Sequence, residues 1–204
     1  MAMGILVSLI IFFSAVIIHE FSHAFIANKL GDPTAKIMGR LTLNPIAHID
    51  PFGTILLPIF LILMNSPVLF GWAKPVPINF ANLKNPRRDI IWVGLAGPLA
   101  NLLSAGVAAL ALNQMGLRTM EPMASIIQSF IIINVVLCVF NLIPIPPLDG
   151  SRVLAGLLPP SLSFKMALFE PYGFLLLFAL ISMGLFDRIV WPITTFILYL
   201  LMKL

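Results

Sequence analysis

Long apolar segments without a charged residue dominate the chain. Four of them are Met1 to Ile18, Pro51 to Ala73, Ile90 to Leu117 and Pro122 to Leu148. Each is long enough to cross a hydrocarbon core of about 30 Å, which takes about 20 residues of helix. Two shorter segments, Pro171 to Phe186 and Ile189 to Met202, predict a tilted hairpin that turns at Asp187-Arg188. The pattern predicts an all-α polytopic membrane protein with about five to six transmembrane helices.

The segment Pro51 to Ala73 differs from the others because it contains residues that interrupt helices. These are Pro58, Asn65, Ser66 and Pro67. Lys and Arg residues flank it on both sides, from Lys29 to Arg40 and from Lys74 to Arg88. By the positive-inside rule both flanks are cytoplasmic, which predicts a re-entrant or helical-hairpin insertion. A full single crossing at 52–70 is the alternative.

The stretch AKIMGRLTLNPIAHID, residues 35–50, has partial alternation of apolar and polar positions and several turn residues. Such a pattern is typical of short paired strands. It predicts a short membrane-associated β-hairpin between the first helix and Pro51.

Composition and charge agree with a membrane protein. Of 204 residues, 60% are hydrophobic and 10% charged, and the mean hydropathy is +1.05; an ordinary soluble domain has far more charge. The net charge of +4 comes from connecting segments, where membrane topology explains it better than nucleic-acid binding. The first segment has no basic n-region, so we expect a retained helix rather than a signal peptide. The single Cys138 supports no disulfide framework.

Candidate chemistry lies at residues 17–25, IIHEFSHAF. On a helix His19 and His23 stand four residues apart, so both imidazoles can reach one ion. Glu20 lies beside that ion, where it can accept a proton from water. This is the H-E-x-x-H arrangement of zinc hydrolases. The alternative is a polar patch that joins helices by hydrogen bonds, but three ionisable groups in five residues are costly in a bilayer and tend to mark function.

A catalytic zinc site needs a third protein ligand and one open position. The candidates are His48, Asp50, Asp149, Glu170 and Asp187. Asp149 follows three prolines at 144, 146 and 147, which forbid a regular helix and leave backbone that must line a cavity or be buried. Asp149 is therefore the preferred ligand. To meet the histidines, it must be separated from them by an even number of membrane crossings.

Three motifs together resemble the site-2 protease family of intramembrane zinc metalloproteases. They are the H-E-x-x-H at residues 19–23, GPLAN at 97–101 and FNLIPIPPLDG at 140–150. The resemblance covers roughly residues 15–158, and NPIAHIDPFG and FGWAKPVP look like a prokaryotic branch. It implies one Zn²⁺ per chain held by His19, His23 and Asp149, with Glu20 as the general base and Asn141 near the metal.

The resemblance also implies the biological setting. We expect a single membrane-embedded protease domain with a core at 1–158 and a C-terminal helical hairpin at 171–204. No PDZ or CBS module is visible in the sequence. The expected partners are the bilayer and transmembrane protein substrates, the expected location is a prokaryotic cell membrane, and the positive-inside rule puts the active site nearer the cytoplasmic face.

Three further polar residues and the function of the whole chain allow more than one interpretation. His48 is a gate, a substrate contact or a transient ligand, or else an interfacial histidine in a turn. Asn101 either acts near the active site or joins helices through its amide. Asn141 precedes the prolines and could donate to a developing oxyanion. For the whole chain, the alternative function is a metal-ion transporter or a non-catalytic metal-binding membrane protein.

Overall fold

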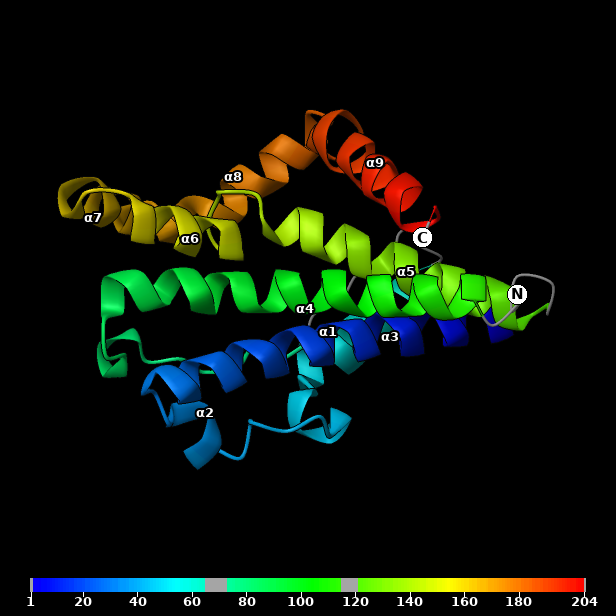
Figure 1. Ribbon diagram of the computed structural model, residues 1–204, viewed down its shortest axis with the longest axis horizontal. Coiled ribbons are helices and arrows are strands. Elements are labelled where there is room, and N and C mark those ends of the chain that lie inside the picture. Colours follow the sequence, from blue (N-terminus) through cyan, green and yellow to red (C-terminus); the bar gives the residue numbers. More distant parts are fainter. Residues whose placement is uncertain (1, 65–72, 115–120, 204) are drawn as a thin grey trace.

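Three long helices that lie side by side form the body of the protein in a computed structural model, which describes residues 2–64, 73–114 and 121–203 (Figure 1). They are α1 (Ala2–Leu30), α4 (Pro86–Gln114) and α5 (Met123–Asn141). Each is long and apolar enough to cross a membrane. The described residues contain helices and no strands, so the prediction of an all-helical protein is confirmed.

Residues spaced four apart let α1 and α4 approach closely. Because i and i+4 lie on one face of a helix, they form a stripe along each helix. The buried stripe of α1 consists of Ala15, His19, His23 and Ala27. The buried stripe of α4 consists of Val93, Gly97, Asn101, Ala105 and Ala109. Small residues on both stripes bring the backbones together, as is usual for helices in membranes.

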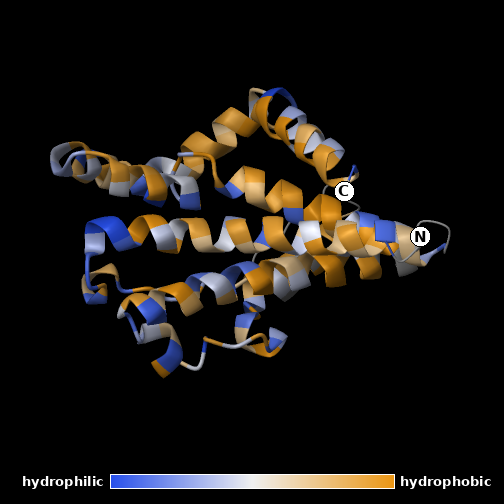
Figure 2. Ribbon diagram, in the orientation of Figure 1, coloured by the Kyte–Doolittle hydropathy of each residue, from blue (hydrophilic) through white to orange (hydrophobic). Residues whose placement is uncertain are grey.

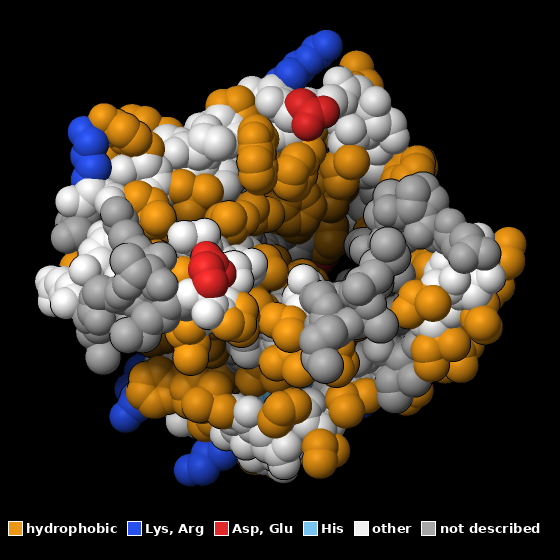
Figure 3. Space-filling view, turned by 90° about the vertical axis from the view of Figure 1, so that its right-hand side faces the viewer, with side chains coloured by type: hydrophobic (Ala, Val, Ile, Leu, Met, Phe, Trp, Pro, Cys, Tyr) orange, Lys and Arg blue, Asp and Glu red, His pale blue; other side chains and the backbone are white. Residues whose placement is uncertain are grey.

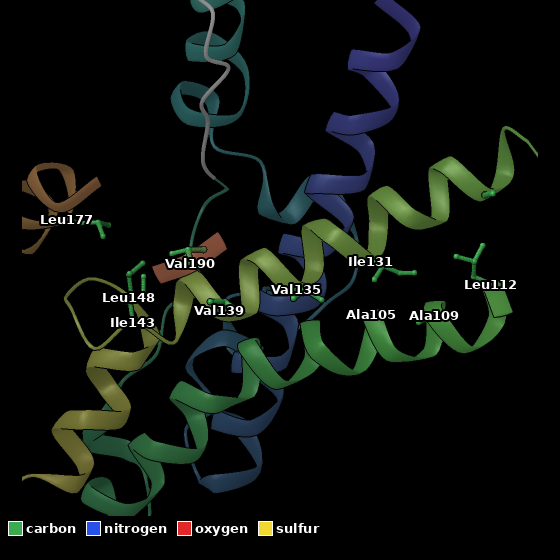
Figure 4. Close-up of a cluster of buried hydrophobic side chains, with 11 residues drawn as sticks. Ala105, Ala109, Leu112, Ile131, Val135, Val139, Ile143, Leu148, Leu177 and Val190 are labelled. Carbon is green, nitrogen blue, oxygen red and sulfur yellow. The ribbon is translucent and has the colours of Figure 1, made fainter. Parts of the chain in front are cut away.

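The main hydrophobic core lies between α4 and α5 and continues toward the C-terminal helices (Figure 4). α4 contributes Ala105, Ala109 and Leu112, and α5 contributes residues such as Ile131 and Val135. Leu177 and Val190 reach the same cluster from the C-terminal part of the chain. The C-terminal segments are therefore packed onto the three-helix body rather than separate from it.

Short helices make up the C-terminal part. They are α6 (Asp149–Leu157), α7 (Pro160–Leu168), α8 (Glu170–Ser182), the π-helix η5 (Phe186–Val190) and α9 (Trp191–Leu201). At 1.5 Å per residue, α8 spans only about 20 Å and α9 about 17 Å. α7 and α8 are bent by 71° relative to each other. The described residues thus hold three helices long and apolar enough to span a membrane, or four if this bent pair is one span, and the predicted five to six are not confirmed.

The predicted β-hairpin at 35–50 is wrong. This part of the chain forms α2 (Thr34–Ile37) and the 3-10 helix η1 (Pro45–His48), followed by the π-helix η2 (Pro51–Leu56) and α3 (Leu57–Leu63). Backbone N–H groups here find partners nearby: Asn44 Oδ1 accepts from Ile46, and Asp50 Oδ1 accepts from Phe52 and Gly53. Local capping by Asn and Asp side chains competes with strand pairing, and here the local caps form instead of paired strands.

The two ends of the 49–73 segment meet. The N–H of Lys74 donates to the carbonyl of His48 over 3.0 Å. A segment that leaves and returns to one place makes no net crossing, which favours the re-entrant or hairpin insertion over a single crossing at 52–70. Residues 65–72 of this segment lie outside the described residues.

The outer surface of the helices is apolar, as a bilayer requires. Large hydrophobic side chains such as Leu103, Val107 and Phe178 are exposed, and hydrophobic residues cover most of the helical ribbon in Figure 2. The end that carries both termini is also mainly hydrophobic and is hollowed at its centre (Figure 3). Exposed apolar surface on this scale indicates contact with lipid.

Candidate metal centre

His19, His23 and Asp149 converge at one point inside the protein. Asp149 Oδ2 lies 2.9 Å from Nε2 of His19 and 3.0 Å from Nε2 of His23, and the two Nε2 atoms are 3.0 Å apart. All three residues are buried. Each offers one atom to a group that could hold a metal ion. The structure therefore brings together the three residues that the sequence singled out.

Hydrogen bonds at Nδ1 define which ring nitrogens face this point. His23 Nδ1 lies 2.6 Å from the carbonyl of Val93, which can only accept, so Nδ1 carries the proton. His19 Nδ1 lies 2.6 Å from Asn101 Oδ1. The amide nitrogen of Asn101 donates to Ala15 O and Asn134 Oδ1, so its oxygen must accept from His19. In both neutral imidazoles the Nε2 lone pair is left to face the carboxylate.

This arrangement suits a zinc ion. Two neutral imidazole nitrogens and a carboxylate oxygen oppose one another with no hydrogen between them, so only a cation or an added proton relieves their repulsion. Two His and one carboxylate are a usual catalytic zinc set, and they leave one position open. Ligand atoms on tetrahedral zinc lie about 3.3 Å apart, slightly more than the separations here. Small shifts of the three side chains suffice to admit the ion.

Gly97 gives the imidazoles their space. A Cβ at Gly97 would lie 2.4 Å from His23 Nε2 and 2.6 Å from His19 Nε2. No side chain larger than hydrogen fits there without displacing both rings. Gly94, one turn earlier on α4, lies against the backbone carbonyl of Asp149, 3.1 Å from where its Cβ would be. The glycines of α4 thus bring this helix to all three members of the cluster.

The proline-rich loop delivers Asp149 at the start of α6. The three prolines keep residues 144–148 out of a regular helix, and α6 then begins at Asp149 itself. Gly150 follows, and a Cβ there would lie 2.2 Å from the carbonyl of Leu142. The close approach folds the loop back onto the end of α5. Asp149 Oδ2 faces the histidines, and Oδ1 lies 3.7 Å from Nη1 of Arg152.

Glu20 lies next to the cluster but outside it. It is half-buried on α1, directly after His19. Its Oε2 accepts a hydrogen bond of 2.8 Å from the backbone N–H of Val76. Glu20 is not one of the three residues whose side chains could hold the ion.

The other predicted residues lie elsewhere. His48 is buried, and its Nε2 donates to Thr42 O over 2.8 Å. Asp50 caps η2, while Glu170 and Asp187 are exposed. Asn141 donates to the carbonyl of Leu137 in its own helix. Among the described residues, none of the rival third ligands joins the histidines.

Asn134 is a site residue that sequence analysis missed. It is fully buried on α5, and its Oδ1 accepts from Asn101 Nδ2 over 2.8 Å. Asn101 on α4 in turn holds His19 on α1. The hydrogen-bonded amides of Asn134 and Asn101 thus connect α5 to the metal-binding cluster. The available signal was a lone amide in the apolar run FIIINVVL, since buried polar groups in membrane helices need partners.

Removal of these amides is expected to weaken zinc binding. Asn101→Leu leaves His19 without its Nδ1 partner, and loss of such outer contacts costs about 10- to 100-fold in metal affinity. Asn134→Leu should act in the same direction but less, because Asn101 keeps its contact with His19. Competition of purified protein with a zinc chelator measures the affinity. Asn113→Leu, about three turns further along α4, is the control, and an equal loss there would contradict the assignment.

Comparisons with known proteins point to zinc metalloproteases. The model of "Peptidase family M50" matches residues 117–180. Over 195 residues the chain is 42% identical to "Putative zinc metalloprotease YwhC" of Bacillus subtilis, covering 92% of this chain and 84% of that protein. It is 32% identical to Rip2 of Mycolicibacterium smegmatis, a protein of the same description, covering 84% of this chain and 64% of that one. No solved structure matches the chain significantly.

An apolar helical body around a buried His-His-Asp cluster defines a membrane metalloprotein. The chain belongs to peptidase family M50, the site-2 protease family, and is a zinc metalloprotease. The resemblance of its three motifs to the site-2 protease family is thereby confirmed.

Proposed function

We propose that the chain is an endopeptidase that cuts transmembrane or membrane-bound protein segments, with zinc held by His19, His23 and Asp149. The observation that carries this proposal is the convergence of two Nε2 lone pairs and one carboxylate at a buried point between α1, α4 and α6. The apolar outer surface supports a bilayer setting for the reaction.

Each residue of the site has a distinct task. Zinc, when bound, acts as a Lewis acid that polarises a carbonyl group and makes water more acidic. Glu20 takes the proton from the attacking water and later delivers it to the leaving amine. Asn101 and the Val93 carbonyl keep His19 and His23 in the tautomer that presents Nε2. Asp149 supplies the anionic ligand from the other side.

Asn141 remains a proposed oxyanion donor. One hydrogen of its amide is used by Leu137 O, at 3.0 Å, which leaves the second for a substrate. His48 remains a proposed gate or substrate contact; its backbone carbonyl joins the two ends of the 49–73 insertion, so its displacement would open that insertion.

The orientation in the membrane follows from where the basic residues lie. The C-terminal end of α1, the N-terminal end of α4 and the segment after α5 lie at the same end of the bundle (Figure 1). That end carries Lys29, Lys36, Arg40, Lys84, Arg87 and Arg88. The positive-inside rule makes it cytoplasmic. The zinc site is then nearer the cytoplasmic face, within one membrane-embedded domain that includes the C-terminal helices.

Metal content tests the proposal. We expect purified protein to hold one zinc per chain, to cleave a membrane-spanning peptide, and to lose both on chelation and regain both when zinc is added. Asp149→Ala should bind zinc far more weakly, because one of three ligands is gone. Asp187→Ala, an exposed carboxylate on η5, is the control. Wild-type zinc content in Asp149→Ala would contradict the ligand set.

A further inference from the structure

The carboxylate of Glu20 is held from outside its own helix. Its partner, the N–H of Val76, comes from a segment 56 residues further along the chain. Among the described residues, no other hydrogen bond holds this carboxylate. A glutamate side chain has three rotatable bonds, so a single charge-assisted bond largely decides where its oxygens lie.

Val76 belongs to residues 73–79, a segment without regular secondary structure that we call the strap. Hydrogen bonds fasten the strap just before Val76. The Lys74 N–H donates to His48 O, and Arg40 Nη2 donates to the carbonyls of Lys74 and Pro75 over 2.8 and 3.3 Å. The Val76 side chain is buried in a cluster with Ala24 and Ala35. The N–H that faces Glu20 is therefore fixed independently of Glu20.

Asp32 fastens the far end of the strap. Its Oδ2 accepts from the N–H of Asn79 over 2.8 Å, and its Oδ1 accepts from Asn82 Nδ2 over 3.0 Å. Burial alone would raise the pKa of Asp32, but hydrogen bonds from Thr34, Asn82 and the Asn79 N–H lower it below the usual value. The carboxylate therefore stays charged and keeps these bonds at neutral pH.

The sequence around Val76 leaves a single backbone hydrogen-bond donor in the middle of the strap. Val76 lies between Pro75 and Pro77, which have no N–H, so this three-residue stretch offers a single backbone donor. A residue before proline also prefers an extended conformation, which restricts the backbone of Val76. The K-P-V-P motif thus presents one N–H on a stiff backbone.

We propose that the backbone N–H of Val76 is a positioning group for the general base. It binds Oε2 of Glu20 and leaves Oε1 free to take the proton from water. The strap is then part of the catalytic geometry rather than only a connection between the 49–73 insertion and α4. This inference rests on the proposed function, in which Glu20 is the base.

Val76→Pro tests the inference because it removes the N–H at a position that already lies between two prolines. We expect kcat for a membrane-spanning peptide to fall about 10- to 100-fold, as for a misplaced base, while KM and zinc content stay near wild type. Val76→Ala keeps the N–H and should retain most of the wild-type kcat. A purely structural role for Val76 would affect Val76→Ala as well and would lower the melting temperature in parallel.

A second variant covers the case in which Val76→Pro does not fold. Arg40→Met removes the guanidinium that fastens Lys74 and Pro75 but keeps an apolar stem, so it should lower kcat in the same direction by loosening the strap. Equal kcat values in Val76→Pro and Val76→Ala, or a rise in Val76→Pro, would overturn the inference; the rise would mean that the strap blocks the base. Either result leaves the proposed function intact, because that depends on zinc binding and peptide cleavage by the unaltered protein.

Discussion

Glu20→Gln is expected to abolish peptide cleavage while zinc stays bound. Glutamine has the same shape and can still accept the Val76 N–H, so the strap should keep its place. It cannot take a proton from water, and loss of a general base costs about 10²- to 10⁴-fold in rate. Glu20 is outside the three-atom cluster, so metal content should not change. Cleavage of a membrane-spanning peptide and zinc per chain are measured on the same purified sample.

The same variant separates the protease from the alternative functions. A transporter would hold its ion with the same three ligands but has no need of a general base, so ion flux would survive Glu20→Gln. Retained proteolysis at wild-type zinc content would refute Glu20 as the base. Asp50→Asn, which changes a capping carboxylate on η2, controls for the loss of one negative charge.

The sequence predicted which residues form the His-His-Asp cluster because two of its features constrain the geometry. Residues 19 and 23 share a helix face in any α-helix, and the prolines before Asp149 mark unwound backbone in an apolar setting. The even number of crossings also agrees with the structure, since α4 and α5 separate the ligands and the 49–73 segment returns to its starting point. Local pattern and membrane length together were sufficient for these features.

Other features depend on contacts that no local pattern specifies. Partial alternation at 35–50 indicated strands, yet capping by Asn44 and Asp50 satisfied the backbone locally. The charge-free segments near the C-terminus gave an upper limit for the number of transmembrane helices. α8 and α9 are each too short to cross a membrane alone. The Asn134–Asn101 and Val76–Glu20 contacts join residues 33 and 56 positions apart. Such pairs follow from helix packing, and one sequence does not reveal them.

Gly97→Ala is expected to destroy the metal site with a single methyl group. The added Cβ would lie 2.4 Å from His23 Nε2 and 2.6 Å from both Nε2 and Cε1 of His19. Real carbon and nitrogen atoms do not approach so closely, so both rings must turn away or α1 and α4 must separate. Either change moves the two Nε2 atoms away from Asp149 Oδ2. Zinc per chain and peptide cleavage should therefore fall together, below the levels of the Asn101→Leu variant.

Gly106→Ala is the matched control because it makes the same change on the same helix. A Cβ at Gly106 meets only Leu201 Cδ2, at 4.0 Å, an ordinary contact. Alanine in place of glycine favours a helix by up to about 1 kcal/mol, so neither variant should lose helix content. If Gly97→Ala binds zinc as tightly as Gly106→Ala, then α4 does not pack against the imidazoles as described. In that case α4 and α1 are not as close as described, and the proposed positions of all three ligands would be wrong.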